Sequence, residues 1–484
     1  MDISQLTKLR AAGKLEEMAA VAHELDLYTT AGFSVHYAPS QAVSGSDPEA
    51  LIYRALAQTL RAQPTLFAVP IVREGAETYF ARLPSIDLRQ VTTFVARAKG
   101  VPGPGDGGRD AELDAVLQEQ VNLNFKSEAG VLPVWRFIAL YDGPEKLGFT
   151  ANFMAHHAIA DGASFQILHR EFHKALHDLF SSSSLSSSPT SQAETHVEYV
   201  VSPKDSDVIG PPIEAIHSLQ LPEPAPQPDE EASPKFNDWL GNPPSLPNST
   251  GYTTLTLTPA AVASWTRECR KNKVAPPAGL NALLTRSIYA ALPAATESMD
   301  VNIPVDVRGS LPPAAVDGVM GNFFDAFRIR VLRSDFASDG KEDGTEGLGA
   351  IWPSAKKVAR ETRAYFSRTT ADGEAILNIA GLRNVPDLHA LLTSLITGPR
   401  SEALELAYIG PHVPYSSGET LRWDAGKATV SRCAFALGAC LQMTVVLHAE
   451  GMTIGFAWPR AAIEERLVEE TIAGVRGYFD SITA

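Results

Sequence analysis

The stretch from His156 to Gly162, which reads His-His-Ala-Ile-Ala-Asp-Gly, constrains this chain more than any other, because regular structure is predicted on both of its sides. Upstream, residues 135–141 are rich in aromatic and branched side chains, a turn is indicated at 142–144, and residues 147–154 alternate with period two, so two strands are predicted. Downstream, apolar side chains recur at helical spacing from about Ser164. The stretch is therefore predicted to be the turn between a strand and a helix. Such a turn can hold an imidazole rigidly and aim it into a cleft.

The same layout recurs near the C-terminus. Residues 440–447 and 452–458 are predicted strands joined by a turn, and a helical pattern follows them. This second copy has Trp-Pro-Arg-Ala at 458–461, where the first copy has its histidines. Strand, turn, strand and helix thus occur once in each half, which predicts two similar α/β lobes of which one carries the chemistry.

The length of 484 residues exceeds what one hydrophobic core usually serves, so two domains are expected. Residues 181–191 are rich in serine, and proline is frequent among acidic residues from 203 to 247. We therefore predict an N-terminal lobe at 1–180, a crossover linker at 181–250 and a C-terminal lobe at 251–484.

Charge and cysteine content restrict the partners and the compartment. A net charge of −15 argues against nucleic acid or an anionic membrane as the main partner, and a polyanion would need a local basic patch. The three cysteines fit neither a disulfide framework nor a metal-binding spacing, which suggests a reducing compartment. No signal peptide and no apolar run of membrane-spanning length is apparent, so we expect a cytoplasmic protein without an integral membrane segment.

A metal site is not expected. His169, His173 and His177 are spaced at i, i+4 and i+8, a spacing that can bind zinc. No cysteine or suitable carboxylate completes the shell, and the predicted helix must bury one of its faces.

The pattern His-His-x-x-x-Asp-Gly resembles the signature of the superfamily that includes chloramphenicol acetyltransferase, the BAHD acyltransferases, peptide-synthetase condensation domains and fungal alcohol acetyltransferases. The resemblance implies two α/β lobes, each a mixed sheet with flanking helices, that meet along a tunnel holding the active site. The opening, a helix predicted over residues 5–23 that leads into a strand at 32–37, is similar to the start of fungal alcohol acetyltransferases. The Asp-Phe-Gly-Trp-Gly motif of plant BAHD enzymes is absent, and residues 407–411 stand nearest to it. The chain thus resembles the fungal enzymes most closely.

Acyl transfer from a thioester to a hydroxyl needs a base, and neutral imidazole suits this because its pKa lies near working pH. The resemblance assigns the base to His157, without a covalent acyl-enzyme, and makes His156 a structural or lining residue. Asp161 is either a catalytic carboxylate or one half of an ion pair with Arg308, and the resemblance favours the ion pair. The N–H of Gly162 near a helix start could face the oxyanion of the tetrahedral intermediate.

Four further residues are candidates for substrate binding. The segment 319–324 resembles the family's Gly-Asn segment beside the acyl donor, so Asn322 could bond pantetheine, assist the oxyanion, or serve only in a turn. Ser431 stands roughly where the alcohol acetyltransferases carry a hydroxyl near the reacting carbonyl. Lys356 and Arg360 lie with two more basic residues on one predicted helix, which could meet coenzyme A phosphates or form a solvated face.

The expected reaction is transfer of an acyl group, acetyl above all, from acetyl-coenzyme A to a hydroxyl of a small, rather apolar alcohol of the secondary-metabolite type. Acetyl-coenzyme A is then a cosubstrate, no permanently bound cofactor is expected, and a monomer is expected. Two alternatives stay open at this point. The donor could be held on a carrier protein, as in condensation domains and product-releasing transferases, or the protein could only bind its ligand or perform a non-acyl reaction.

Overall fold

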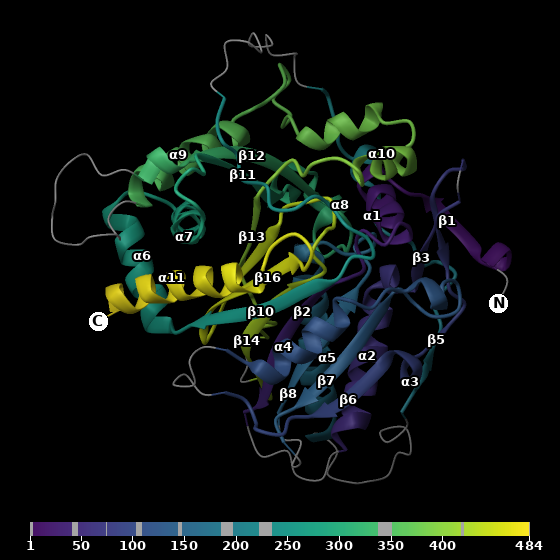
Figure 1. Cartoon of the computed structure of the whole chain (residues 1–484). Helices are drawn as coiled ribbons and strands as arrows, with labels where there is room; N and C mark the ends of the chain where they lie inside the picture. The colour runs from purple at the N-terminus through teal and green to yellow at the C-terminus, as the bar shows by residue number, and fades with distance from the viewer. Residues whose placement is uncertain are drawn as a thin grey trace.

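The computed structural model describes residues 3–40, 47–73, 75–102, 109–143, 148–184, 197–221, 235–336, 351–417 and 421–483. Two mixed sheets with helices on their faces dominate the fold (Figure 1). The five-stranded sheet has the order β14-β2-β8-β7-β6. Its strands are β2 (Ala31–Pro39), β6 (Thr92–Ala96), β7 (Trp135–Tyr141), β8 (Phe149–Ala155) and β14 (Trp423–Arg432). The six-stranded sheet has the order β10-β16-β15-β13-β11-β12. Its strands are β10 (Thr250–Leu257), β11 (Ser298–Asp306), β12 (Phe324–Leu332), β13 (Leu404–Pro411), β15 (Leu441–His448) and β16 (Gly451–Pro459).

The motif turn connects strand β8 to helix α5 (Gly162–Ser184), as predicted, while residues 144–147 of the preceding turn lie outside the described residues. β7 and β8 are antiparallel, and every residue of β8 is buried. Both faces of this strand pair are buried because other elements pack on each of them. Phe137 and Phe153 pack into the core that α5 shares, whereas Ile138 and Met154 pack toward α4 (Ala111–Gln120) and β10.

The two sheets repeat a four-strand arrangement. β6 lies parallel to β7 and β2 antiparallel to β8, while β13 lies parallel to β15 and β10 antiparallel to β16. Helix α11 (Glu465–Thr483) follows β16 as α5 follows β8, and it packs on α6 (Pro259–Lys271) and α7 (Pro276–Ala291). The predicted α/β class with two similar halves is therefore confirmed.

Strand β14 crosses between the halves. A division at 181–250 assigns it by sequence to the C-terminal lobe, whereas its hydrogen bonds place it beside β2 in the first sheet, with Ser431 opposite Gly32. The carbonyl of Val430 accepts from the Tyr252 hydroxyl at 2.9 Å and from Thr444 Oγ1 at 3.1 Å, and both donors belong to the second sheet. β14 thus ties the two sheets together.

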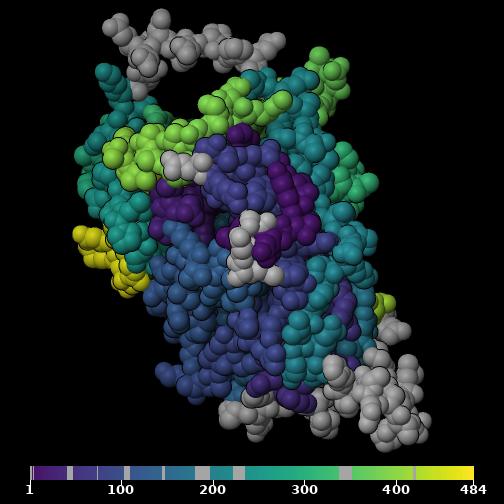
Figure 2. All heavy atoms as spheres, turned by 90° about the vertical axis from the view of Figure 1, so that its right-hand side faces the viewer, coloured from purple at the N-terminus to yellow at the C-terminus, as the bar shows by residue number. Residues whose placement is uncertain are grey.

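The helix predicted over residues 5–23 is wrong in its first half. Residues Thr7–Ala11 form strand β1, which pairs with β4 (Tyr79–Arg82) in a three-stranded sheet with β3 (Ala68–Ile71). Helix α1 (Lys14–Glu24) begins only after Gly13, whose N–H donates to Glu16 at 2.8 Å. Figure 2 shows the purple N-terminal segment between the blue first half and the green second half, beside a hollow in this face.

Parts of the predicted linker contact the folded halves where they are described, although most of its described residues are exposed or only partly buried. β9 (Val200–Val201) pairs with β5 (Ile86–Asp87), and the Gly210 carbonyl accepts from Arg10 Nε at 2.8 Å. Residues 185–196 and 222–234 of the predicted linker lie outside the described residues. Among the helices that the structure describes, none has both the length and the apolarity needed to cross a membrane.

Candidate active site

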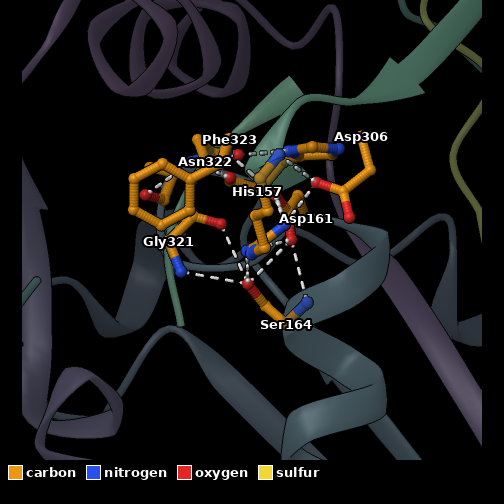
Figure 3. A network of polar contacts seen from close by, with 9 residues as sticks. His157, Asp161, Ser164, Asp306, Gly321, Asn322 and Phe323 are labelled. Atoms are coloured by element: carbon orange, nitrogen blue, oxygen red, sulfur yellow. Dashed lines mark hydrogen bonds and ion pairs between the residues drawn. The ribbon is translucent and has the colours of Figure 1, made fainter. Parts of the chain in front are cut away.

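His157 lies on the turn between β8 and α5, and Asn322 from the second half orients its ring. The Asn322 side-chain amide donates to the carbonyls of His157 at 2.8 Å and Ala158 at 2.9 Å. Its carbonyl oxygen therefore faces His157 Nδ1, 3.2 Å away (Figure 3). Because an amide oxygen only accepts, Nδ1 carries the proton and Nε2 keeps its lone pair. The two carbonyl contacts thus assign the tautomer.

The surroundings of His157 favour the neutral ring. Burial lowers the pKa of His157 below its usual value, and this effect outweighs the charge of Asp161, which raises it. The ring is half-buried and meets Tyr28 and Phe324 edge-on, at centroid distances of 5.6 and 5.5 Å. At neutral pH the imidazole is therefore available as a base.

Asp161 and Arg308 form a bidentate ion pair across the two halves of the chain. Arg308 Nη1 and Nη2 donate to the two carboxylate oxygens at 2.8 and 3.0 Å, and the Phe323 N–H donates to Oδ2 at 2.9 Å. Burial alone would raise the pKa of Asp161, but the charge and hydrogen bonds of Arg308 hold it below its usual value. Within the described part of the chain, no hydrogen bond joins the carboxylate to the His157 ring. The contacts are those of the ion pair that the resemblance favoured, not of a triad.

Ser164 completes this network and was not singled out from the sequence. Its backbone N–H donates to Asp161 Oδ1 at 2.8 Å, which caps the start of α5. Its hydroxyl lies 2.8 Å from the same carboxylate oxygen and accepts from the Gly321 N–H at 3.0 Å. The spacing Asp161-x-x-Ser164 at a helix start was the available signal. The turn is therefore held by residues 321–323 of the second half.

His156 is a buried structural residue. Its Nδ1 accepts from the Ala158 N–H at 2.9 Å, and its ring packs against His23 with centroids 4.5 Å apart. Burial lowers the pKa of His156 well below its usual value, with His23 and His157 adding to the effect. It is therefore neutral, and it is not among the residues that line the cavity described next.

A cavity of about 400 Å³ lies at the motif turn and is lined by residues from both halves of the chain. His157, Gly162 and Ser431 line it, as do Asp161 and Arg308. Helix α1 also contributes to its wall. The structure thus brings five of the predicted site residues together around one space, with Asn322 behind His157.

The first two residues of α5 lie at the cavity. Gly162 and Ala163 line it, and no hydrogen bond of their N–H groups is found among the described residues. A Cβ at Gly162 would lie 2.7 Å from Ile409 Cδ1, so a side chain there would require the end of the Ile409 side chain to shift. The first N–H groups of a helix carry a partial positive charge that suits an oxyanion.

Ser431 lies on β14, and its buried hydroxyl is 3.8 Å from Met154 Sδ. A Cβ at Gly32, opposite it, would lie 2.9 Å from the Ser431 hydroxyl and 2.2 Å from the Met154 sulfur. Glycine at position 32 therefore allows the two strands to bring this hydroxyl to the cavity.

The predicted basic helix is α9 (Ile351–Phe366), and none of its residues lines the cavity. Lys357 pairs with Asp335 at 2.8 Å, and Arg360 lies 3.1 Å from Glu361. Lys356 is exposed. A role of Lys356 and Arg360 in binding coenzyme A phosphates stays a prediction.

His169 and His173 each form a hydrogen bond with a backbone carbonyl of a distant segment. His169 Nε2 bonds the Phe33 carbonyl at 2.9 Å, and His173 Nε2 bonds the Trp423 carbonyl at 2.8 Å. In the described ranges, no group of three or more histidine, cysteine, aspartate or glutamate residues could hold a metal ion.

Sequence reasoning also missed an ion pair on the cavity wall. Arg432, the last residue of β14, contacts Glu405 of β13, and both line the cavity. Neither residue stands in a recognisable motif, and the two residues belong to strands of different sheets.

No family model matches the chain. It is 34% identical over 473 residues to the "Probable alcohol acetyltransferase crmB" of Aspergillus fumigatus, and the alignment covers 97% of this chain and 98% of that relative. The resemblance inferred from the motif is therefore confirmed.

Solved structures share the fold at low identity. The trichothecene 15-O-acetyltransferase TRI3 of Fusarium sporotrichioides matches with a TM-score of 0.69 and 10% identity, over 98% of this chain and 95% of that one. The first condensation domain of the CDA synthetase matches with a TM-score of 0.60 and 12% identity, over 98% and 96%. Polyketide synthase associated protein 5 of Mycobacterium tuberculosis gives 0.60 and 13%, over 99% and 98%. At these identities the likeness shows the fold alone.

Proposed function

This chain belongs to the alcohol acetyltransferase family, and we propose that it transfers an acetyl group from acetyl-coenzyme A to a hydroxyl of a small alcohol. The observation that carries the proposal is His157. Its ring lines the cavity with Nδ1 bonded to Asn322, so that Nε2 is the free basic nitrogen. A binding protein would not need an imidazole held in one tautomer.

In the proposed reaction, His157 Nε2 takes the proton of the acceptor hydroxyl as its oxygen attacks the thioester carbonyl. The C–O bond forms, and the carbonyl electron pair moves to the oxygen of a tetrahedral intermediate. When this intermediate collapses, the C–S bond breaks, and the imidazolium returns its proton to the departing thiolate. Both substrates react directly, so no acyl-enzyme forms.

The oxyanion has donors at hand in the cavity. The free N–H groups of Gly162 and Ala163 start helix α5, and the Ser431 hydroxyl lines the same space. Fixed donors of this kind stabilise developing negative charge without reorganisation. Asp161 and Arg308 act as positioning residues, because their bonds hold the turn that carries His157.

The His157→Ala variant tests the base. We expect transfer, followed by thiol release with acetyl-coenzyme A and a panel of alcohols, to fall by about 100- to 10,000-fold because general-base catalysis is lost. The matched control is His389→Ala on α10 (Leu388–Leu395), a histidine outside the cavity, which should keep full activity. Unchanged turnover in His157→Ala would refute the role of His157.

The donor is tested separately by calorimetric titration with acetyl-coenzyme A and free coenzyme A. Micromolar binding of acetyl-coenzyme A supports the proposed donor. Absence of binding to either compound, in protein that is folded by its melting curve, contradicts it and favours a donor held on a carrier protein.

A further inference from the structure

A buried ion pair stands on the wall of the cavity. Arg432 Nη2 contacts both Glu405 Oε1 and Gln442 Oε1, and the Asn302 side-chain amide donates to Glu405 Oε2 at 2.9 Å. The Arg432 and Glu405 side chains are only 14% and 11% exposed. Arg432, Glu405 and Asn302 all line the cavity.

Stability alone does not account for this pair. Burying two charges costs free energy that their mutual attraction only partly offsets, and apolar residues of similar volume often serve a core as well. Much of the remaining wall is apolar and includes Leu15, Phe324, Ile409 and Phe435. Charged groups retained in a cavity next to a basic imidazole are therefore candidates for ligand recognition.

The Arg432 guanidinium has N–H donors that these two contacts do not use. Both of its contacts run through Nη2, and for Nη1 no hydrogen bond is found among the described residues. Arginine carries five N–H donors, so the pair still offers hydrogen bonds to a molecule in the cavity. Arg432 lines the same cavity as His157, and its charge adds to the larger effect of burial in lowering the pKa of His157.

The charges of the cavity select the kind of group that Arg432 can bind. Glu405 neutralises Arg432, and Glu402 of the same lining is itself paired with Arg328 at 2.7 Å. A phosphate or carboxylate placed beside Arg432 would be repelled by the Glu405 carboxylate. A neutral oxygen, such as a hydroxyl, ether or carbonyl, accepts a hydrogen bond from Nη1 without this repulsion.

We propose that Arg432, held by Glu405 and Asn302, forms a polar subsite that binds a second oxygen of the acceptor alcohol. The substrates are then alcohols with at least one further hydroxyl, ether or carbonyl oxygen, which narrows the class of small, rather apolar alcohols expected from the sequence. This inference rests on the proposed alcohol acetylation and names its substrate class.

The test compares cyclohexanol with the three positional isomers of cyclohexanediol as acceptors. The wild-type protein should prefer at least one diol by about 10- to 100-fold in kcat/KM, the range expected for a charge-assisted hydrogen bond. Arg432→Lys keeps a charge for Glu405 but lacks the free Nη1 donor. It should reduce the preference, taken as the ratio of kcat/KM for the diol to kcat/KM for cyclohexanol, by about tenfold.

A second variant removes the pair without leaving a lone buried charge. Arg432→Met with Glu405→Gln keeps an acceptor for Asn302, and it should abolish the preference for the diol. The matched control, Arg330→Met with Asp300→Asn, removes an ion pair between β11 and β12 that does not line the cavity. It should leave kcat/KM unchanged for both acceptors.

Three results would overturn the subsite. The first is a wild-type protein without preference for any diol. The second is an equal loss of kcat/KM for cyclohexanol and diol in Arg432→Lys, and the third is a change in that variant that is confined to a rise in the KM of acetyl-coenzyme A. If the wild-type protein acetylates none of the four alcohols, the proposed reaction on such alcohols fails, but the subsite is still decided by saturation-transfer NMR. Tighter binding of a diol than of cyclohexanol that disappears in Arg432→Lys supports the subsite, and equal binding contradicts it.

Discussion

Asn322 determines which nitrogen of His157 is basic, so its replacement tests the site at the scale of one residue. Asn322→Ala removes the bond to Nδ1 and both bonds to the turn carbonyls. We expect kcat to fall by about 10- to 100-fold, because the ring is no longer held in the orientation needed for proton transfer. The KM of the alcohol should change little, because the orientation of the ring does not affect substrate binding. The measurement is steady-state kinetics on folded protein.

The matched control is Asn152→Ala. Asn152 is also buried and also donates to two carbonyls, of Ile138 at 2.9 Å and Thr150 at 3.1 Å, but it does not touch His157. It should lose stability without losing kcat. Equal losses of kcat in the two variants would show that Asn322 acts through stability alone.

The pH dependence belongs to the same residue. Because burial lowers the pKa of His157, the neutral base persists below pH 6.5, and kcat/KM should stay level from pH 8 to about pH 6.5 before falling in acid. Asn322→Asp places a carboxylate near the ring, which stabilises the imidazolium, and the acid limb should move to higher pH. A limb that moves to lower pH, or does not move, would contradict this assignment.

At the scale of elements, the ion pair joins the β8–α5 turn to the 3-10 helix Arg308–Ser310 that follows β11. Asp161→Ala leaves Arg308 without its buried partner, and we expect the free energy of unfolding to fall by about 3–5 kcal/mol in urea titrations. Asp161→Ala combined with Arg308→Met should recover part of this loss, because no lone charge remains. A folded Asp161→Ala protein of wild-type stability but without activity would instead identify a catalytic carboxylate.

Helices and strands with strong periodicity could be predicted from the sequence. Contacts between residues far apart in the chain could not. The strands at Trp135–Tyr141 and Leu441–His448 follow local pattern, so they agree with the prediction. Thr7–Ala11 became a strand because β4 pairs with it, which no local signal reveals. Asn322 and His157 lie 165 residues apart, and the Arg432–Glu405 contact depends on the crossing of β14, so their contacts needed the structure.

At the scale of the whole molecule, buried neutral histidines make the fold sensitive to acid. Burial is the main cause that lowers the pKa of His23 and His412 to about 4, and of His169 and His448 to about 3. The unfolded chain binds protons on these rings from about pH 6.5 downward, whereas the folded chain does not. Stability contributed by these rings is therefore complete above pH 6.5 and is lost as pH falls, by about 1 kcal/mol per ring at pH 5.5.

His412 isolates this effect, because neither of its ring nitrogens has a hydrogen-bond partner in the described chain, and its ring packs against Phe33 at 5.6 Å. His412→Leu keeps an apolar contact and removes one titrating group. We expect the difference in unfolding free energy between pH 7.5 and pH 5.5, from urea titrations at both values, to shrink by about 1 kcal/mol relative to wild type. An unchanged difference would mean that His412 is already protonated in the folded protein or that the unfolded chain does not titrate there.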